Sequence, residues 1–376
     1  MTHPVAWLIW LAGGLVALSA TRNPFYLAVT LFGIGAVLVT VRRHSPEALT
    51  VPLSPLRFAA LVISLSALFN AATVHFGDHV LLHLPSALPL FGGPITLEAF
   101  VFGALNGVVL SGIYTAFLVL NYAVAVRALV GMIPRAFHPV AVVVSIALTF
   151  VPTTLRQFQA IREAQAIRGH HVRGLRDWLP LFLPLLVGGL ERALQLAEAM
   201  TARGFASADR QTLPAAARLS LAGGLALLLA GWLLQLAWRQ PILGPALMAL
   251  GAGSVVVVLW RLGRRVPRTT YRRHPWQIAD TLGALGGVVA AAACAVAWPG
   301  LDRASIFYYP YPTLSLPDFD VVIGLALGGL LLPAALALWQ RMTRSAANAA
   351  DSGAPAVGAA VEVSAQEAWS GSGGGR

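Results

Sequence analysis

The stretch LSLAGGLALLLAGWLLQLAW (Leu219–Trp238) contains twenty residues and no charged side chain. A helix of about 20 apolar residues is long enough to cross the hydrocarbon core of a bilayer. A second stretch of this kind, Val321–Trp339, lies near the end of the chain. A soluble protein with a large core does not account for such long runs without charge, so these stretches indicate membrane-spanning helices.

The composition of the whole chain agrees with this interpretation. Of its 376 residues, 57% are hydrophobic and 11% are charged, whereas a soluble domain carries about 25% charged residues. We therefore predict an all-α, polytopic membrane protein with about eight transmembrane helices. The predicted spans are Val5–Ala20, Phe25–Val41, Phe58–Val74, Glu98–Val126, Leu219–Trp238, Ile242–Trp260, Thr281–Trp298 and Val321–Trp339. The first is expected to be retained as a helix, and Asn23-Pro24 to form a turn with Pro24 opening the second.

The positive charges indicate how the chain is oriented. The formal net charge is +11, and the sequence contains no Lys, so all 26 cationic residues are Arg. They cluster at the ends of the apolar runs, as the positive-inside bias of cytoplasmic loops predicts. A basic protein also suggests nucleic-acid binding, but this placement favours contact with the lipid bilayer and no nucleic-acid partner. Both termini are then inside.

The segment 138–208 departs from the pattern of full-length spans. His138–Pro152 and Trp178–Leu190 are apolar but short, and runs of about 10–14 residues are more often interfacial or buried helices. If the first run crossed the membrane, five Arg between residues 156 and 176 would lie outside, against the positive-inside bias. We predict that 138–208 is a cytoplasmic module of amphipathic helices, although a re-entrant dip of either run stays open. Transmembrane helices then occupy 1–137 and 209–344, and a disordered tail rich in Ala, Gly and Ser occupies 345–376.

Two helices of this module end in an Arg-Gly pair. In TTLRQFQAIREAQAIRG (153–169), a helix is expected to begin at Pro152-Thr153, with the Thr hydroxyl as its cap, and to end at Arg168-Gly169. In GGLERALQLAEAMTARGF (188–205), the end is Arg203-Gly204. Glycine at such a position favours a positive φ and stops the helix. Residues expected to line one side of the second helix are Leu190, Leu194, Leu196, Ala197 and Met200.

A structural explanation of these cations is available. An Arg in the last turn complements the helix dipole and contributes about 0.3–1 kcal/mol. Two such ends in one module favour a second explanation, because an exposed guanidinium presents a flat fork of donors to a partner's carboxylate or groove. The residues alone leave both explanations open.

At these helix ends the sequence resembles a known family, the transmembrane coupling (T) component of energy-coupling factor (ECF) transporters. This EcfT/CbiQ-like family includes the permease subunits of cobalt and nickel importers, and it carries an Ala-Arg-Gly motif at the end of each of two cytoplasmic coupling helices. The second motif is intact here as Ala202-Arg203-Gly204, and the first is Ile167-Arg168-Gly169, with Ile in place of Ala. Matching stretches are NP (23–24), PITLEAFVFG (94–103), FVPTTLRQFQAIREAQ (150–165) and LRDWLPLFLPLLVGGLERA (175–193). The resemblance covers roughly residues 1–208 and, more loosely, RTTYRRHPWQIADTL (268–282) and the last two spans, and the spans at about 219–260 are an addition to that pattern.

The resemblance implies a division of labour between subunits. Arg168, Gly169, Ala202, Arg203 and Gly204 are expected to seat the helix tips in grooves on two cytoplasmic ABC-type ATPases. ATP-driven motion would pass to a separate substrate-binding membrane (S) subunit, for vitamin or transition-metal uptake. The chain itself is expected to be a non-catalytic, multi-pass subunit of the bacterial plasma membrane with no cofactor.

Several residue types bear on other functions. A P-loop requires Lys, so ATP hydrolysis is expected in partner chains, and the one cysteine, Cys294, cannot build a disulfide framework. His75, His79 and His83 have four-residue spacing, but Gly77 and the Pro- and Gly-rich stretch 77–97 favour an external or re-entrant loop over a metal site.

Local features near the span ends give further expectations. Glu98 is expected to be structural and reached by water. Four aromatic residues in the loop 299–317 resemble an interfacial belt, namely Phe307, Tyr308, Tyr309 and Tyr311. Two groups of glycines, at 283, 286 and 287 and at 324, 328 and 329, predict close helix contacts.

The main alternative is a self-contained secondary transporter or channel. Such a protein needs ionisable residues in the middle of spans or paired broken helices, and this chain has few of either. A membrane enzyme is a third class, and the absence of a motif that gathers an acid, a base and a nucleophile argues against it.

Overall fold

The computed structural model describes residues 3–43, 54–83, 92–134, 137–169, 174–205, 214–238, 242–264, 275–296 and 302–352. Its internal contacts divide the chain into two compact units. Unit 1 comprises Met1–Ala125 and Arg273–Arg376, and unit 2 comprises Val126–Arg272. Unit 2 is therefore inserted into the sequence of unit 1.

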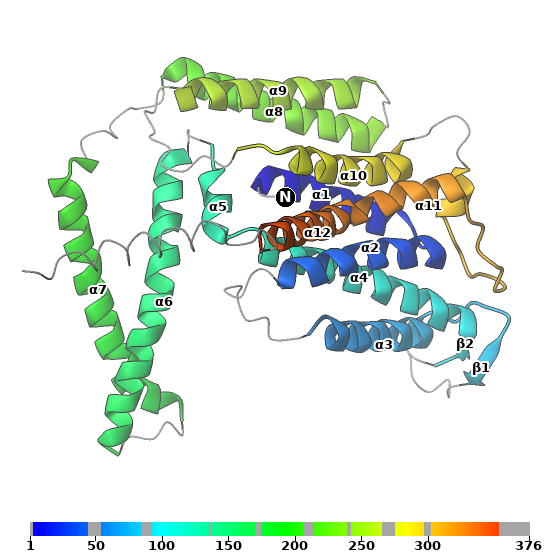
Figure 1. Cartoon of the computed structure of the whole chain (residues 1–376), viewed down its shortest axis with the longest axis horizontal. Helices are drawn as coiled ribbons and strands as arrows, with labels where there is room; N and C mark the ends of the chain where they lie inside the picture. The colour runs from blue at the N-terminus through cyan, green and yellow to red at the C-terminus, as the bar shows by residue number, and fades with distance from the viewer. Residues whose placement is uncertain are drawn as a thin grey trace, which may run out of the picture. The chain divides into compact units, whose positions relative to one another are not determined.

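Unit 1 is a bundle of long helices with a small β-hairpin at one end (Figure 1). The helices are α1 (Pro4–Ala20), α2 (Pro24–Arg42), α3 (Pro55–Thr73), α4 (Leu97–Ala123), α10 (Ile278–Ala295), α11 (Val321–Gly328) and α12 (Leu332–Ser352). Two short 3-10 segments, η4 (Arg303–Ile306) and η5 (Gly329–Leu331), complete it. The all-α prediction is confirmed, and α1 packs on α10 and α4 on both α2 and α3.

The turn between α1 and α2 holds the bundle together at one end. Pro24 opens α2, and the side chain of Asn23 accepts a hydrogen bond from the Phe25 N–H, so the predicted turn is confirmed. Asn23 is fully buried, and its amide donates to the carbonyls of Ser305 and Asp318 at 2.8 and 2.7 Å. A polar side chain thus links the turn to the segment that precedes α11.

Glycines allow two close backbone approaches in this bundle. A Cβ on Gly287 would lie 2.7 Å from the Cα of Trp10, and the Cβ positions of Gly286 and Gly13 are filled by the backbones of Gly329 and Gly287. The predicted close contacts are therefore confirmed at Gly286, Gly287 and Gly329. At Gly328 a Cβ would meet nothing within 4 Å, so the prediction is wrong there.

The stretch 77–97 is more ordered than the predicted loop. Strand β1 (Val80–His83) pairs antiparallel with β2 (Pro94–Thr96), with Val80 opposite Thr96, and residues 84–91 lie outside the described part. The run of Val and Leu in β1 explains this difference, because such residues fit a pleated strand better than an open loop.

Glu98, in the first turn of α4, is fully buried against the hairpin. The His79 backbone N–H donates to both carboxylate oxygens at 3.2 and 3.3 Å, and His79 Nδ1 lies 2.6 Å from Oε1. Gly77 has φ of +149°, and a Cβ there would lie 2.5 Å from Glu98 Oε2. The expectation that water reaches Glu98 is wrong, because the chain folds back over the carboxylate.

The four predicted belt aromatics divide into two pairs. Phe307 and Tyr309 are exposed, as a belt requires. Tyr308 is buried, and Tyr311 packs against Phe76 and Phe102 with ring centroids 5.9 and 5.6 Å away. Burial raises the pKa of Tyr308, so its hydroxyl remains a donor, and it donates to the Ser315 carbonyl.

Unit 2 consists of helices α5 (Val126–Gly131), α6 (His138–Ile167), α7 (Leu179–Ala202), α8 (Ala215–Trp238) and α9 (Leu243–Arg264), with a 3-10 turn η2 (Leu175–Trp178) before α7. Helix α6 is continuous through Pro152, so the predicted helix start at Pro152-Thr153 is wrong. Helix α7 likewise contains Pro184. An internal proline removes one backbone hydrogen bond. In the turn around Pro152 the Thr153 hydroxyl donates to the Thr149 carbonyl of the same helix.

Nine of the described helices are long and apolar enough to cross a membrane. They include α6 and α7, which we predicted not to cross, while α1 is slightly shorter than the others. A helix of this length and composition can span a membrane or lie on its surface, so the cytoplasmic position of 138–208 stays a prediction. The last predicted span is interrupted by η5, and α12 continues to Ser352, beyond the predicted start of the disordered tail at Ser345. Its Ala-rich end favours a helix, and residues 353–376 lie outside the described part.

Helices α8 and α9 form an antiparallel pair that packs through glycines. Gly231 lies against Gly244, and Gly224 against Gly251, where a Cβ would come within 2.8 and 3.2 Å of the opposite carbonyl. Close approach of this kind is the usual way in which membrane helices associate.

Candidate functional site

The two predicted helix tips have nearly the same backbone geometry. Arg168 ends α6 with φ −80° and ψ 7°, and Arg203 ends α7 with φ −84° and ψ 4°. Each is followed by a glycine in the left-handed region, Gly169 with φ +79° and Gly204 with φ +77°. The prediction that both helices end at a glycine of positive φ is confirmed. In each case the glycine N–H donates to a carbonyl three residues back, which closes the last turn.

Both tips leave their side chains accessible. Arg168 and Arg203 are exposed, and neither guanidinium makes a hydrogen bond or ion pair with another residue in the described ranges. A Cβ on either glycine would meet nothing within 4 Å. The tips differ at the preceding residue, because Ile167 presents a large apolar side chain that is 88% exposed, whereas Ala202 is small.

Helices α6 and α7 contact each other well before their tips. The Arg192 guanidinium donates a hydrogen bond to Gln157 Oε1, and Gly188 faces the same Gln157 amide. Beside this contact, Trp178 stacks between Phe158 and Phe182, with ring centroids 6.2 and 5.7 Å away. Figure 1 shows the two helices crossing and then diverging.

The crossing lies equally far from the two tips. Eleven residues separate Gln157 from Arg168, and eleven separate Arg192 from Arg203. At 1.5 Å per residue, each tip stands about 16 Å from the Gln157–Arg192 hydrogen bond along its own helix. The segments from the crossing to the tips, 157–168 of α6 and 192–203 of α7, are therefore equal in length, and both end in an Arg-Gly pair.

Helix α7 carries two apolar faces instead of the one predicted. Leu196 and Met200 are half-buried on the same side as Arg192, which faces α6. Leu190 and Leu194 are 65% and 57% exposed and lie on another side. The exposed leucines continue toward the start of the helix at intervals of three or four residues, through Leu179, Leu183 and Leu186.

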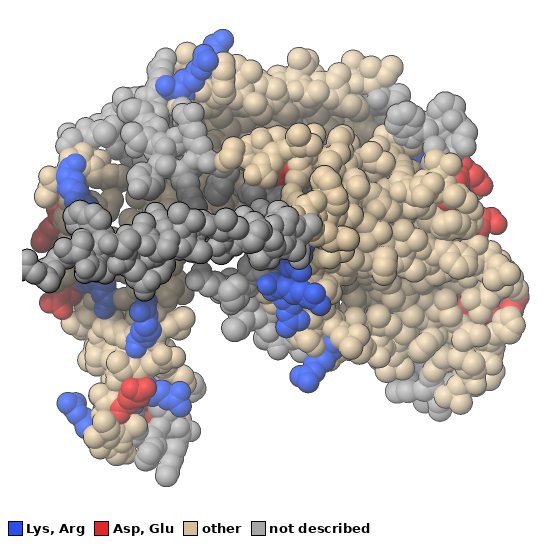
Figure 2. All heavy atoms as spheres, viewed as in Figure 1, with Lys and Arg blue, Asp and Glu red and all other residues tan. Residues whose placement is uncertain are grey.

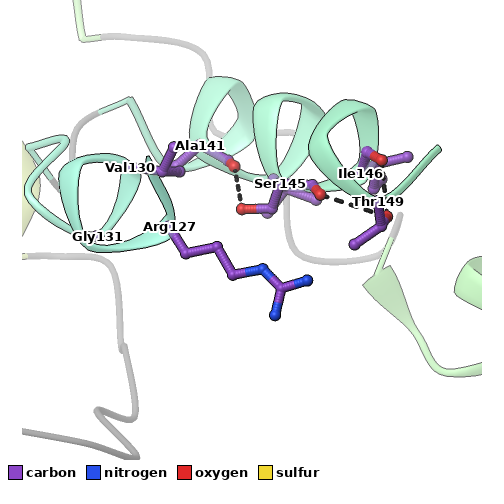
Figure 3. A pocket seen from close by; sticks show the side chains of 8 residues that line it. Arg127, Val130, Gly131, Ala141, Ser145, Ile146 and Thr149 are labelled. Carbon is purple, nitrogen blue, oxygen red and sulfur yellow. Dashed lines mark hydrogen bonds between the residues drawn. The ribbon is translucent and has the colours of Figure 1, made fainter. Parts of the chain in front are cut away.

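A groove of about 360 Å³ lies between α5 and the first half of α6 (Figure 3). Arg127 extends along it from α5, beside Ser145 and Thr149 of α6. Both hydroxyls donate to carbonyls of their own helix, Ser145 to Ala141 and Thr149 to Ile146. Arg127 is therefore the principal donor in this groove, and no Asp, Glu or His is among the described residues that line it.

The charges of unit 1 are distributed between its two ends. Arg42 and Arg43 end α2 and Arg57 begins α3, while Asp302 and Asp320 lie at the opposite end of the bundle together with Arg22 and Arg303. Figure 2 shows acidic side chains at the end of this unit that carries the β-hairpin. This distribution supports the predicted orientation, with the Arg-rich end of unit 1 inside.

Histidines and acidic residues do not gather into a metal centre in the part of the chain that the structure describes. His79 and His83 lie in or beside strand β1 and not on a helix, so the four-residue spacing does not place the three histidines on one helix face. His79 contacts Glu98 instead.

Comparison with known proteins identifies the family. Residues 2–213 match the family described as CbiQ, cobalt transport protein. The chain belongs to the CbiQ family. The match includes both Arg-Gly tips and ends before α8, so the α8–α9 pair lies beyond the part of the chain that matches the CbiQ family.

Curated relatives carry a consistent name. The energy-coupling factor transporter transmembrane protein EcfT of Bacillus selenitireducens is 29% identical over 219 residues, which cover 53% of this chain and 76% of that protein. EcfT of Leuconostoc gelidum subsp. gasicomitatum is 36% identical over 101 residues, 24% of this chain and 38% of the relative. EcfT 1 of Listeria monocytogenes is 28% identical over 140 residues, 32% of this chain and 52% of the relative. With the apolar helices, these relatives place the chain among multi-pass proteins of the bacterial plasma membrane.

Sequence reasoning missed the residues that join α6 to α7. The sequence predicts separate helices for Gln157 and Arg192 without indicating a contact between them, and it places Trp178 at the start of an apolar run. The available signal was a polar pair, Gln157 and Arg192, each eleven residues before its Arg-Gly end.

Proposed function

We propose that this chain is the transmembrane coupling subunit of an ECF-type importer. It would pass the ATP-driven motion of two cytoplasmic ABC-type ATPases to a substrate-binding membrane subunit, for uptake of a vitamin or a transition-metal ion. Membership of the CbiQ family and the names of the EcfT relatives support this role. The chain contributes positioning and motion, and it contains no Lys with which to build a P-loop.

The observation that carries the proposal is the match between the two helix tips. Arg168 and Arg203 lie equally far from the crossing and have nearly the same backbone geometry, and their exposed guanidinium groups have no partner among the residues that the structure describes. Two similar tips fit two similar grooves, one on each ATPase. A guanidinium that meets a carboxylate there forms charge-assisted hydrogen bonds, worth about 1.5–3 kcal/mol each.

The crossing of α6 and α7 gives the tips a common pivot. Because Gln157 and Arg192 join the helices midway, a displacement of one tip turns the pair about this contact. The exposed leucine face of α7 is suited to an apolar partner, and we assign it to the substrate-binding subunit. Movement of the ATPases would then reach that subunit through α7.

The proposal is tested by replacing both tip cations. Arg168→Ala with Arg203→Ala, co-expressed with the ABC-type ATPases encoded in the same genome, is expected to lower ATPase co-purification more than tenfold, because two charge-assisted contacts are lost. Arg162→Ala is the matched control, since Arg162 is exposed on α6 before the tip. Equal yields in the membrane fraction establish that all variants insert.

Two results contradict the proposal. One is unchanged co-purification in the double variant. The other is substrate uptake by the chain alone in vesicles without any ATPase, which favours a self-contained transporter.

A further inference from the structure

Helices α8 and α9 lie outside the region that matches the CbiQ family, and their charge is one-sided. Nine Arg and no Asp or Glu occur between Asp209 and Asp280. An uncompensated group of cations beside a membrane-spanning pair attracts anionic lipid headgroups, by about 1 kcal/mol per Arg near the surface.

The glycine packing places the three Arg that the structure describes in α8 and α9 at one end of the pair. Gly231 lies against Gly244 and Gly224 against Gly251, so the antiparallel register advances by seven residues on each helix. Continued by one more step, this register brings the first turn of α8 opposite the last turns of α9. Arg218 therefore lies at the same end as Arg261 and Arg264.

A groove of about 550 Å³ opens at this end within unit 2. Val256, Leu259 and Trp260 line it with apolar side chains, and Pro134 and Arg264 also line it. The guanidinium of Arg264 lies over the Trp260 ring, 4.0 Å from the centroid. This contact fixes the cation beside an aromatic ring of the kind that favours the membrane interface.

The Arg264 guanidinium and the apolar groove beside it match the two parts of a phospholipid, its charged headgroup and its acyl chain. A phosphate would meet Arg264, with Arg218 and Arg261 at the same end of the pair, and a hydrocarbon chain would lie along Val256 and Leu259. An acidic protein surface would use the cations but not the apolar groove. We propose that the Arg264 end of the α8–α9 pair binds an anionic phospholipid in the inner leaflet, with its phosphate on Arg264 and one acyl chain in this groove.

The test measures lipid bound to the purified full chain. Native mass spectrometry compares the retention of phosphatidylglycerol and phosphatidylcholine of identical acyl chains. Arg264→Gln is expected to lower phosphatidylglycerol binding about fivefold, and Arg261→Gln with Arg264→Gln about twenty-five-fold, while phosphatidylcholine binding changes little. Val256→Trp fills the groove from its exposed side and is expected to lower the binding of both lipids.

Controls separate a site from general attraction. Arg57→Gln removes the same charge from an exposed position on α3 and should leave phosphatidylglycerol binding unchanged. Equal losses in Arg57→Gln and Arg264→Gln would overturn the proposal, because net charge alone would then explain binding. Unchanged binding in Val256→Trp would also overturn it. Displacement of the lipid by glycerol phosphate would show that the groove contributes nothing, and specific retention of an acidic protein without lipid would assign the surface to a protein partner. None of these outcomes bears on the ATPase contacts of α6 and α7.

Discussion

Helices α4 and α10 of unit 1 and helices α6 and α7 of unit 2 are all apolar enough to span a membrane, yet their surroundings differ greatly. Half of the apolar window of α4 and of α10 is buried inside the chain, against 6% for α6 and for α7. Polar groups follow the same division. Asn23, Glu98 and Asp280 are fully buried in unit 1, whereas Arg168 and Arg203 are exposed. Hydropathy thus identifies the helices of both units. What distinguishes the units is whether polar side chains are buried among the helices, as in unit 1, or exposed, as on α6 and α7.

The buried polar links of unit 1 should be the most costly to break. Asn23→Ala removes two hydrogen bonds to carbonyls and the cap of α2, which should destabilise the bundle by about 3 kcal/mol. Thermal unfolding can be followed in detergent with a thiol-reactive fluorophore, because the one cysteine, Cys294, is buried in α10. Asn121→Ala, at an exposed position near the end of α4, is the control and should leave the transition in place. Equal transitions for the two variants would contradict the comparison.

The contact between α6 and α7 is the next most sensitive point. A Cβ at Gly188 would lie 2.5 Å from Gln157 Nε2, so Gly188→Leu should displace the Gln157 side chain and break its hydrogen bond with Arg192, at about 1–3 kcal/mol, which loosens the crossing of the helices. Spin labels at the exposed positions Ala164 and Ala199, in a Cys294→Ser chain, should report a shifted and broader distance distribution. At Gly189 a Cβ would meet nothing within 4 Å, so Gly189→Leu should keep the original distribution. If both variants behave alike, the crossing is not fixed by this contact.

The exposed Ile167 sharpens the difference between the two tips. If the first tip enters a partner groove, burial of this side chain should contribute to binding, and Ile167→Ala should weaken ATPase binding about tenfold, or about 1.5 kcal/mol. Leu155→Ala, exposed earlier on α6, should have little effect. Tighter binding by Ile167→Ala would mean that Ile obstructs the groove where the family has Ala.

The smallest effect is expected at the helix stops. Gly204→Ala places a Cβ at φ +77°, which costs about 1 kcal/mol although the space is empty. The backbone is expected to shift and turn Arg203, so that ATPase affinity falls about fivefold. Gly189→Ala on the same helix should leave affinity unchanged, because its substitution meets neither positive φ nor a neighbour. If the Gly204→Ala variant and the unmodified chain bind the ATPase with equal affinity, the positive φ at this glycine is not needed for binding.

The features predicted well from the sequence depend on a few adjacent residues. Asn23-Pro24 carries its own cap and its own helix start, and Gly169 and Gly204 each stop a helix through their own φ. The candidate tips could therefore be located from the sequence, and the resemblance to the family supplied their proposed role.

The features that the sequence does not predict depend on contacts between residues far apart in the sequence, or on a helix that tolerates an internal proline. The sequence predicts a boundary at Pro152 because an internal proline usually breaks a helix, but α6 continues through it. Gln157 and Arg192 are 35 residues apart, and no local sequence pattern predicts their hydrogen bond. The sequence predicts that water reaches Glu98, because residues 77–97 are predicted to form a loop. In the structure Gly77 and His79 lie against the carboxylate and bury it.

Two hydrogen bonds between the first helix of unit 1 and its C-terminal part have a consequence for biosynthesis. The His3 backbone N–H donates to Asp280, and the Trp10 indole to the Leu330 carbonyl, across 277 and 320 residues. At a translation rate of about 5–20 residues per second, α1 waits on the order of tens of seconds before its partners leave the ribosome. During that interval its Trp-rich face must be shielded by lipid or by the insertion machinery, so shortening the inserted unit 2 should speed assembly of the bundle.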